Sequence, residues 1–200
     1  MKAKLLAIAL GIGLCSCGQR IPNSYRAYFN KNCNGTGEDI TSLIDINGSF
    51  NIRNVIKSRH YDTNNKTILF YKDGLCVEGW RIYEWDVQKY LDEVIANEGK
   101  DYFYINADWG CYEIRQDTII IRSITPGTGL RPISVWETRY KVIDRHTIEQ
   151  VFYTRLENKR KGVPLKDETD SDFIYLPSVF TPLSNIPDSK YSWLSKERCK

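Results

Sequence analysis

Apolar and polar residues alternate along most of the chain from about residue 40 onward. A period of two residues predicts β-strands that bury one face. The runs meet at short turns rich in Asn, Asp and Gly, which favour β-hairpins. The predicted hairpins join 43–46 with 50–56, 68–71 with 75–83, 102–105 with 110–115, and 133–143 with 147–156. Two further extended segments are expected at 118–124 and 173–180.

One segment has a different period. Its apolar residues recur at positions i, i+3, i+4, i+7 and i+8: Val87, Tyr90, Leu91, Val94 and Ile95. This spacing places them on one face of a helix. Asp86 is a suitable N-cap and Gly99 follows shortly after the last turn. The sequence therefore predicts one inserted helix near 86–97.

About eight sequential short strands in an antiparallel meander favour a small barrel or a strongly curved sheet, because closure removes exposed strand edges. We expect a mainly β fold with the single inserted helix described above. No internal repeat is visible in the sequence.

Several short segments also occur in a characteristic order: 47–50, 69–74, 109–114, 117–121, 186–189 and 193–194. Together they resemble small lipoproteins of the Bacteroidetes, which are lipocalin-like. The resemblance spans roughly residues 45 to 195 and consists mostly of turn chemistry and strand pattern. It implies a lipocalin-like barrel. It implies no catalytic residue, because the family brings no known activity.

The chain begins with a different kind of pattern. Lys2 and Lys4 precede an apolar run over 5–14, which is too short to span a bilayer. This combination predicts a secretory signal peptide. An ordinary secretory signal and a short buried helix are the alternative interpretations.

The run ends at Cys15-Ser16-Cys17, preceded by Leu14, which resembles the lipobox of bacterial lipoproteins. In that motif a Leu stands at −3, a small residue at −1, and the next cysteine is acylated. The resemblance implies a signal peptide over 1–16 and a lipidated Cys17. A tether would then cover 17–39 and a single β-rich domain 40–200.

A lipidated Cys17 implies a place in the cell envelope, with the membrane as a partner. One acyl chain anchors a protein only marginally, so more than one chain, palmitate among them, is expected. Residues 18–23 lack the acidic cluster that resembles a surface-export signal in this phylum, and the first acid is Glu38. We therefore expect the outer membrane, with the domain facing the periplasm.

The net charge of the chain bears on whether nucleic acid is a partner. The formal net charge is +3, and loss of Lys2 and Lys4 with the signal peptide brings it to +1. Nucleic-acid-binding proteins usually carry a strong basic excess. We therefore expect no nucleic-acid partner.

Four cysteines remain after Cys15 and Cys17 are set aside: Cys33, Cys76, Cys111 and Cys199. An even number outside the cytoplasm favours disulfides. Strand alternation places Cys76 and Cys111 on solvent-side faces, so a Cys76–Cys111 bridge is one option, with Cys33–Cys199 joining the two ends. The sequence does not choose among the three pairings. No two cysteines have the C-x₂-C spacing of a zinc site, so no metal is expected.

Candidate chemistry is sparse. The chain lacks a nucleophile elbow, a phosphate-binding loop, a dinucleotide-binding glycine pattern and a zinc-protease motif. His60 and His146 are interpreted as surface residues. Acid pairs such as Glu78 with Glu84, or Asp108 with Glu113, give only weak support for glycosidase activity. We therefore expect no enzyme, no catalytic residue and no cofactor.

Aromatic residues are the better candidates for function. Trp80, Trp109 and Trp136 lie in or beside predicted strands, where aromatic faces stack on sugars and apolar ligands. Core packing is the competing interpretation of these side chains. The sequence thus predicts a non-catalytic module that binds a small apolar or saccharide ligand. The alternative is an accessory or structural protein of the envelope that acts through contacts with a protein partner.

Overall fold

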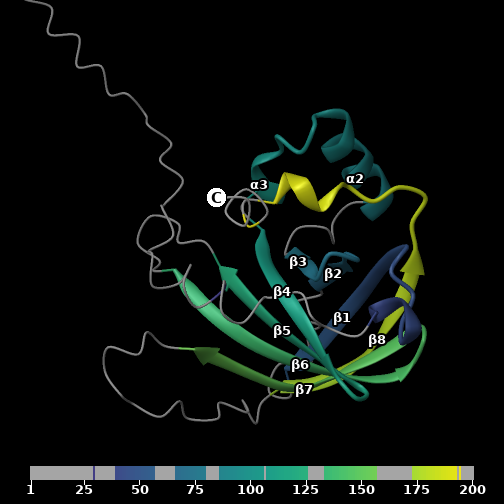
Figure 1. Ribbon diagram of the computed structural model, residues 1–200, viewed down its shortest axis with the longest axis vertical. Helices are drawn as coiled ribbons and strands as arrows, with labels where there is room; N and C mark the ends of the chain where they lie inside the picture. The colour runs from purple at the N-terminus through teal and green to yellow at the C-terminus, as the bar shows by residue number, and fades with distance from the viewer. Residues whose placement is uncertain are drawn as a thin grey trace, which may run out of the picture.

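The computed structural model describes residues 29, 39–56, 66–79, 86–105, 107–125, 133–156, 173–192 and 194. Within them, eight antiparallel strands close into a barrel in the order β1 to β8 (Figure 1). The strands are β1 (Gly48–Ile56), β2 (Lys66–Phe70), β3 (Leu75–Gly79), β4 (Asp108–Arg115), β5 (Thr118–Thr125), β6 (Ser134–Asp144), β7 (Thr147–Leu156) and β8 (Phe173–Pro182). The predicted mainly β barrel is confirmed.

Three tight turns lie at one end of the barrel, which we call the turn end; the opposite end is the far end. They are the turns at 71–74, 116–117 and 145–146. In the first, Gly74 has a positive φ of 85°, and the side chain of Asp73 accepts a hydrogen bond of 3.1 Å from the Leu75 amide. The Asp-Gly hairpin predicted from the sequence therefore forms as expected.

A short 3₁₀ helix, η1 (Ile40–Ser42), precedes β1 and packs against the turn end. Asp39 caps it by accepting a 3.0 Å hydrogen bond from the Thr41 amide. Ile40 and Ile44 are 2% and 0% exposed and join the apolar cluster inside the barrel. The prediction of a strand at 43–46 is wrong, because these apolar side chains cover the turn end instead of pairing with β1.

The outer face of β2 to β4 is covered by a helical layer (Figure 1). The inserted helix is confirmed as α2 (Val87–Ala96), capped by Asp86, and its buried face includes Leu91 and Val94. A second, short helix, α3 (Tyr102–Ile105), occupies residues predicted as a strand, and this prediction is wrong. The Asp101 side chain accepts a 2.8 Å hydrogen bond from the Tyr104 amide, which favours the helical turn.

The segment after β8 completes this layer and contains the 3₁₀ helix η3 (Ser189–Tyr191). The Ser184 amide donates to the side chain of Gln88 on α2 at 2.7 Å, and the Ser189 hydroxyl donates to Asp73 at 2.8 Å. None of the helices in the described part of the chain is long and apolar enough to cross a membrane.

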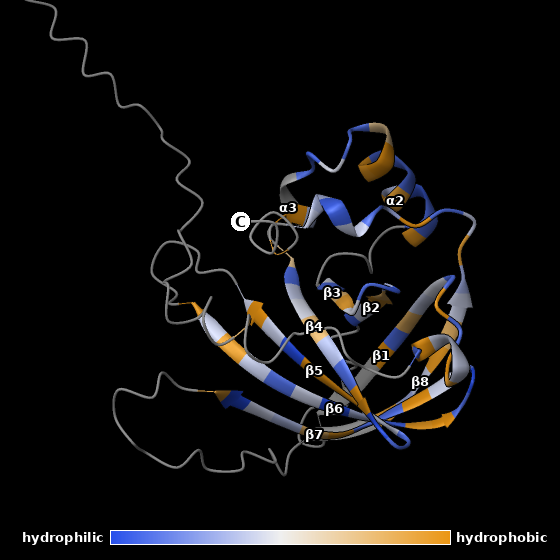
Figure 2. Ribbon diagram, in the orientation of Figure 1, coloured by the Kyte–Doolittle hydropathy of each residue, from blue (hydrophilic) through white to orange (hydrophobic). Residues whose placement is uncertain are grey.

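Hydropathy alternates along the strands, as Figure 2 shows for β4 to β7, but both faces of β2 to β4 are buried. Register places one alternating set beneath the helices, including Leu69, Val77 and Trp109. The other set faces the barrel interior and includes Ile68 and Cys76. Neighbouring residues on one strand are therefore buried in two different clusters.

The barrel closes between its last strands over a short distance. The residue pairs between β7 and β8 are Thr147 with Val179 and Ile148 with Ser178, at the turn end. By contrast, β8 pairs with β1 along its whole length, from Gly48↔Pro182 to Ile56↔Phe173. Among the described residues, the β7–β8 seam is the shortest strand pairing of the barrel.

Candidate functional site

The inner face of the barrel changes from apolar to polar in the same direction on successive hairpins. Beside the turns, the inward residues are Phe70, Cys76, Ile114, Ile119, Tyr140 and Ile148. Farther from the turns, the inward residues include Ile68 and Trp136 together with Lys66, Glu78, Asp108, Ser123, Thr138 and Tyr153. The far half of the interior therefore carries polar and ionisable groups, and it is the candidate site.

Glu78 is the most unusual residue of this half. Its carboxylate Oε2 lies 3.5 Å from the Lys66 ammonium, and the two side chains are only 4% and 16% exposed. The other oxygen, Oε1, is buried and has no hydrogen-bond partner among the described residues. A buried acceptor without a partner destabilises the folded chain, and more so when it carries charge.

Two other buried side-chain oxygens in the described part of the chain lack a partner, and both are hydroxyls, of Ser49 and Ser178. A hydroxyl carries no net charge, so its unmet hydrogen bond costs less than that of a carboxylate. Glu78 thus stands apart as the charged group of the three.

Asp108 places a second carboxylate beside the first. It is the register partner of Glu78 across β3 and β4, and it is 6% exposed. Burial of a carboxylate costs free energy unless the group is paired and hydrogen-bonded, and here two buried carboxylates lie on neighbouring strands. Natural proteins keep such violations of packing rules mainly at functional sites.

Two aromatic rings adjoin these charges. Trp136 on β6 stacks on Tyr153 of β7, with ring centroids 4.8 Å apart and planes 9° apart. The indole nitrogen donates to the Thr125 hydroxyl at 3.1 Å, and the Arg155 guanidinium lies 5.7 Å from the indole centroid. Trp136 is half-buried, so part of the aromatic surface stays accessible at the far end.

A contact across the barrel joins the charges to the rings. The Lys66 ammonium lies 6.0 Å from the centroid of Tyr153. Strands β2 and β7 are not neighbours, because β1 and β8 separate them on the shorter way around the barrel. The contact therefore crosses the interior. We call Lys66, Glu78, Asp108, Trp136 and Tyr153 the far-end cluster.

Of the three tryptophans proposed from the sequence as ligand contacts, Trp136 remains a candidate. Trp136 belongs to the far-end cluster. Trp80 lies outside the described residues. Trp109 faces the helical layer and is 0% exposed, so its assignment as a ligand contact is wrong. It stacks on Tyr71 at 5.8 Å, and its indole nitrogen donates to the Tyr104 carbonyl at 3.0 Å.

The cysteines also depart from the expected arrangement. Register pairs Leu75 with Cys111 and Cys76 with Gly110, so Cys76 and Cys111 project to opposite faces of the sheet. Cys76 is a free, fully buried thiol, and burial raises its pKa well above the usual value. Cys111 is disulfide-bonded. The predicted Cys76–Cys111 bridge is therefore wrong, and Cys33, Cys199 and Cys17 lie outside the described residues.

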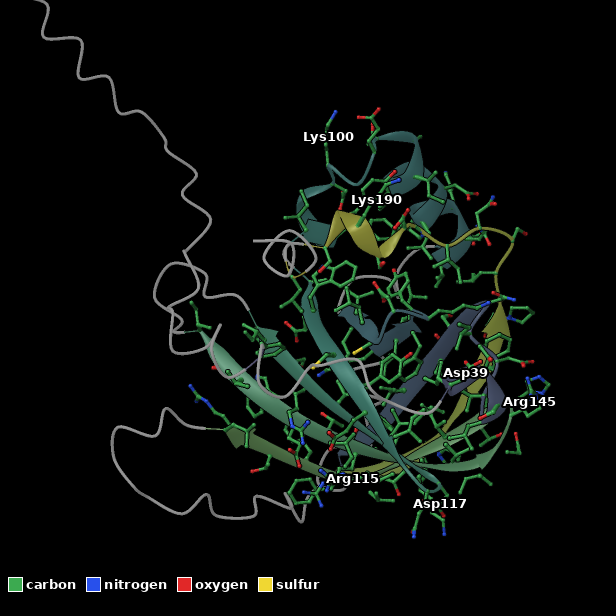
Figure 3. The ribbon with its side chains drawn as sticks, viewed as in Figure 1. Asp39, Lys100, Arg115, Asp117, Arg145 and Lys190 are labelled. Carbon is green, nitrogen blue, oxygen red and sulfur yellow. The ribbon has the colours of Figure 1, made fainter. Side chains whose placement is uncertain are left out.

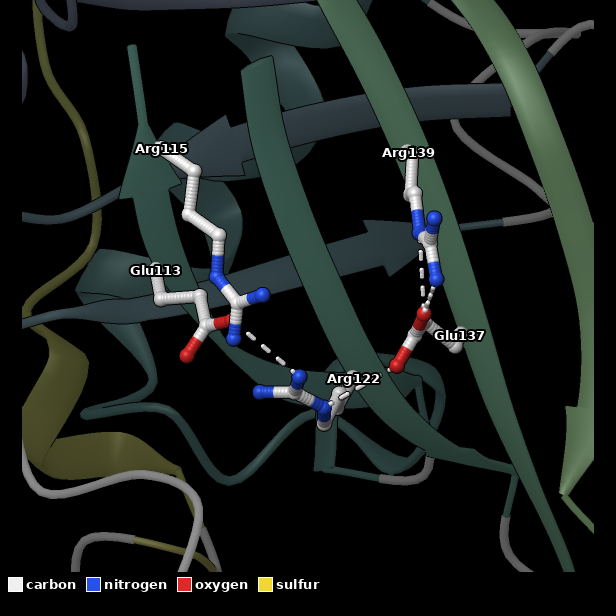
Figure 4. A network of polar contacts seen from close by, with 5 residues as sticks. All are labelled: Glu113, Arg115, Arg122, Glu137 and Arg139. Carbon is white, nitrogen blue, oxygen red and sulfur yellow. Dashed lines mark hydrogen bonds and ion pairs between the residues drawn. The ribbon is translucent and has the colours of Figure 1, made fainter.

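The outer face of the same hairpins carries a chain of ion pairs, drawn in Figure 4. Arg122 contacts both Glu113 and Glu137 at 3.2 Å, and each carboxylate also pairs with a second arginine, Arg115 or Arg139, at 2.7 Å. Burial alone would raise the pKa of Glu113, but its hydrogen bonds and charge contacts with Arg122 and Arg115 lower it. These groups satisfy one another, which favours a structural role.

A pocket of about 350 Å³ lies outside the turn end, between the 71–74 turn and the 186–189 segment. Its lining includes Asp73, which is already hydrogen-bonded to the Leu75 amide and the Ser189 hydroxyl.

Charged side chains lie on both sides of the molecule. Lys100 and Lys190, near the helical layer, lie on the opposite side from Arg115 and Asp117 (Figure 3). Across the described ranges, no group of three His, Cys, Asp or Glu side chains is placed to hold a metal ion.

Most of the far-end cluster was not singled out as a joint site from the sequence. The sequence does contain a signal for it. On the three hairpins, the inward positions beside a tight turn are apolar, and most of the polar inward positions lie farther from that turn. Reading that gradient requires knowledge of which face points inward, and alternation alone does not give it where both faces are buried.

Comparisons of this chain with protein-family models, with curated proteins and with solved structures return no match.

Proposed function

We propose that this protein is a lipid-anchored, extracytoplasmic binding module that holds a small ligand at the far end of its barrel without catalysis. The observation that carries the binding role is the buried Glu78 oxygen without a partner, which lies among inward-facing charges and a stacked aromatic pair. A ligand group that donates a hydrogen bond to this oxygen would offset the cost of burying it.

Binding is tested by recovering the ligand with the protein. The full chain, purified from its native envelope, is analysed by native mass spectrometry for a co-purifying small molecule. We expect a bound mass that is lost in Trp136→Ala and retained in Val179→Ala, because Val179 is 58% exposed on β8 and away from the far-end cluster. Equal ligand occupancy in the two variants would contradict binding at this site.

The anchoring part of the proposal rests on the sequence around Cys17. Lipid on this cysteine is the membrane attachment, so Cys17→Ala should abolish incorporation of a radiolabelled fatty acid. Cys15→Ala is the matched control and should keep the label, since Cys15 belongs to the signal peptide. Label in the Cys17→Ala protein would show that the assignment is wrong.

The outer-membrane, periplasm-facing location is tested by external protease. Intact cells should protect the chain, and permeabilised cells should expose it. Digestion in intact cells, with a periplasmic marker protected, would place the domain on the cell surface.

A second candidate role is that of an envelope accessory protein that acts through protein contacts. It is favoured by exposed apolar side chains on the wall opposite the helices: Ile143, Val151 and Val179 are 51%, 50% and 58% exposed. Exposed apolar residues mark interaction surfaces when they gather in one patch. Crosslinking in the native envelope distinguishes the roles: loss of a crosslinked partner in Val179→Lys, with ligand binding intact, would favour this second one.

A further inference from the structure

We propose that the ligand of the far-end cluster is a neutral saccharide, with the Glu78 carboxylate as its main hydrogen-bond acceptor. This inference rests on the proposed function and narrows it, because the sequence left apolar and saccharide ligands equally open. Three observations carry it: the unsatisfied carboxylate oxygen of Glu78, the donors and acceptors on the same inner face of the barrel, and the formal charges of the described residues there.

The carboxylate argues against an apolar ligand. Oε1 of Glu78 is buried and unpartnered among the described residues, and a hydrocarbon placed beside it would leave it so. Apolar sites in proteins are lined by apolar atoms for this reason. An apolar ligand would fit the turn half of the interior, but phenylalanine, tyrosine and isoleucine side chains already fill that half.

The surrounding groups match hydroxyls. Lys66 supplies an ammonium donor and Glu78 supplies a carboxylate acceptor. The buried hydroxyls of Ser123 and Thr138 lie on the inner face of β5 and β6, where Ser123 is the register partner of Trp136, and a hydroxyl can both donate and accept. A saccharide hydroxyl also donates and accepts at one atom, so a single ligand group can form hydrogen bonds with both the donors and the acceptors of the site. The C–H face of a sugar ring packs on aromatic surface, which Trp136 offers at the same end.

Charge decides between a neutral ligand and an amine. Among the described inward residues at the far end, Lys66 and Arg155 carry positive charge, while Glu78 and Asp108 carry negative charge. The formal charges of these four described residues cancel, and a neutral ligand adds no net charge to them. A cationic ligand that reached the Glu78 carboxylate would also approach the Lys66 ammonium, which lies 3.5 Å from it, and would be repelled by that charge.

The test uses the full chain in lipid nanodiscs and three probes: a glycan array, the apolar dye N-phenyl-1-naphthylamine, and putrescine. Empty nanodiscs supply the blank for the dye. We expect one or more neutral glycans to bind. Isothermal titration with that glycan should then show at least a tenfold loss of affinity in Glu78→Leu and in Trp136→Ala, and no change in Val179→Ala.

Glu78→Gln serves as a second variant, because it keeps the shape of the side chain and one acceptor oxygen. It should lose less affinity than Glu78→Leu, and thermal melting of both variants checks that they fold. Equal affinities for the glycan in Glu78→Leu and the parent chain would overturn the role of Glu78.

The remaining outcomes separate the inference from the proposed function. If the dye or putrescine binds in a Trp136-dependent manner and no glycan does, the saccharide assignment fails and the binding function stands. If none of the three probes binds, both fail.

Discussion

The turn end and the far end of the barrel interior are built from the same hairpins, but they differ in what they bury. At the turn end, Phe50 and Ile119 are 1% and 0% exposed and pack among other apolar side chains. At the far end, Glu78 and Asp108 are buried almost as fully, at 3% and 6%. Burial of the first pair stabilises the fold, whereas burial of a carboxylate costs free energy, and Oε1 of Glu78 has no hydrogen-bond partner to offset that cost. The stability gained by apolar burial at the turn end thus offsets the cost of burying charged groups at the far end.

The largest effect is expected from truncating an aromatic side chain at the turn end. Phe50 contacts Phe180 at 5.4 Å and Phe70 at 6.0 Å between ring centroids. Phe50→Ala should lower the free energy of unfolding by about 3–5 kcal/mol, since it leaves a cavity in a packed core. Urea unfolding measures it. The control Val179→Ala, on the exposed outer face, should change it by less than about 0.5 kcal/mol.

A loss of under about 1 kcal/mol in Phe50→Ala would mean that the turn end is not tightly packed. The contrast between the two ends would then fail.

The next effect concerns the ion pair at the far end. Lys66→Met removes the partner of Glu78 and leaves its carboxylate buried without a counter-charge. We expect a loss of about 1–3 kcal/mol. The double variant Lys66→Met/Glu78→Leu should recover this loss or exceed the parent stability, because apolar residues often replace buried ion pairs at no cost. Urea unfolding of the three chains tests it, and a double variant less stable than Lys66→Met would contradict it.

A smaller effect is expected from the far-end aromatic residue. Trp136 is half-buried, so Trp136→Ala should cost about 1–2 kcal/mol, less than Phe50→Ala. Trp136→Phe keeps the stack on Tyr153 but removes the hydrogen bond to Thr125, and should cost about 1 kcal/mol or less. Thermal or urea unfolding ranks the variants. If Trp136→Ala costs as much as Phe50→Ala, the far end is a packed core and not a site.

The smallest effect is a pH dependence at the turn end. Hydrogen bonds from Arg145 and His146 lower the pKa of Asp45, which ties the segment before β1 to the 145–146 turn. A lowered pKa stabilises the fold above the unfolded value of about 3.9, and this contribution is lost as pH falls through the folded value. The Tm of Asp45→Asn should therefore be lower than that of the parent chain at pH 5, which is above the unfolded pKa.

Below about pH 4 the same difference should shrink. A difference that grows below about pH 4 would mean that Asp45 is not stabilised by these partners. The carboxyl is partly exposed, so solvent keeps the effect small.

The fold was predictable from the sequence where local signals agree. Asp73-Gly74 specifies a turn between two β-rich runs, and the spacing from Val87 to Ile95 specifies one helical face. Both form as expected. The prediction failed at Tyr102–Ile105, where an aromatic, β-prone run becomes helical because Asp101 caps it and the helical layer buries Tyr104.

The candidate site was predictable only in part. Trp136 followed from residue type, but the face of each strand did not. Alternation identifies residues that share a face, as Cys111 and Glu113 do, but the opposite face of β4 is buried too. Where helices cover the outside of a barrel, hydrophobicity no longer marks the inside, so Trp109 and the Cys76–Cys111 pair were misplaced.

The pairing of β1 with β8 has a consequence for how the chain folds. The Asn51 side chain donates to the Thr181 hydroxyl at 3.2 Å across 130 residues of sequence. Contacts between residues so far apart in sequence form slowly, because the chain loses conformational entropy in closing the loop before the contacts stabilise it. During synthesis, β1 keeps one unpaired edge until residues 173–182 have been made. That edge is a template for pairing with other chains, so the nascent protein is most prone to aggregate just before its last strand arrives.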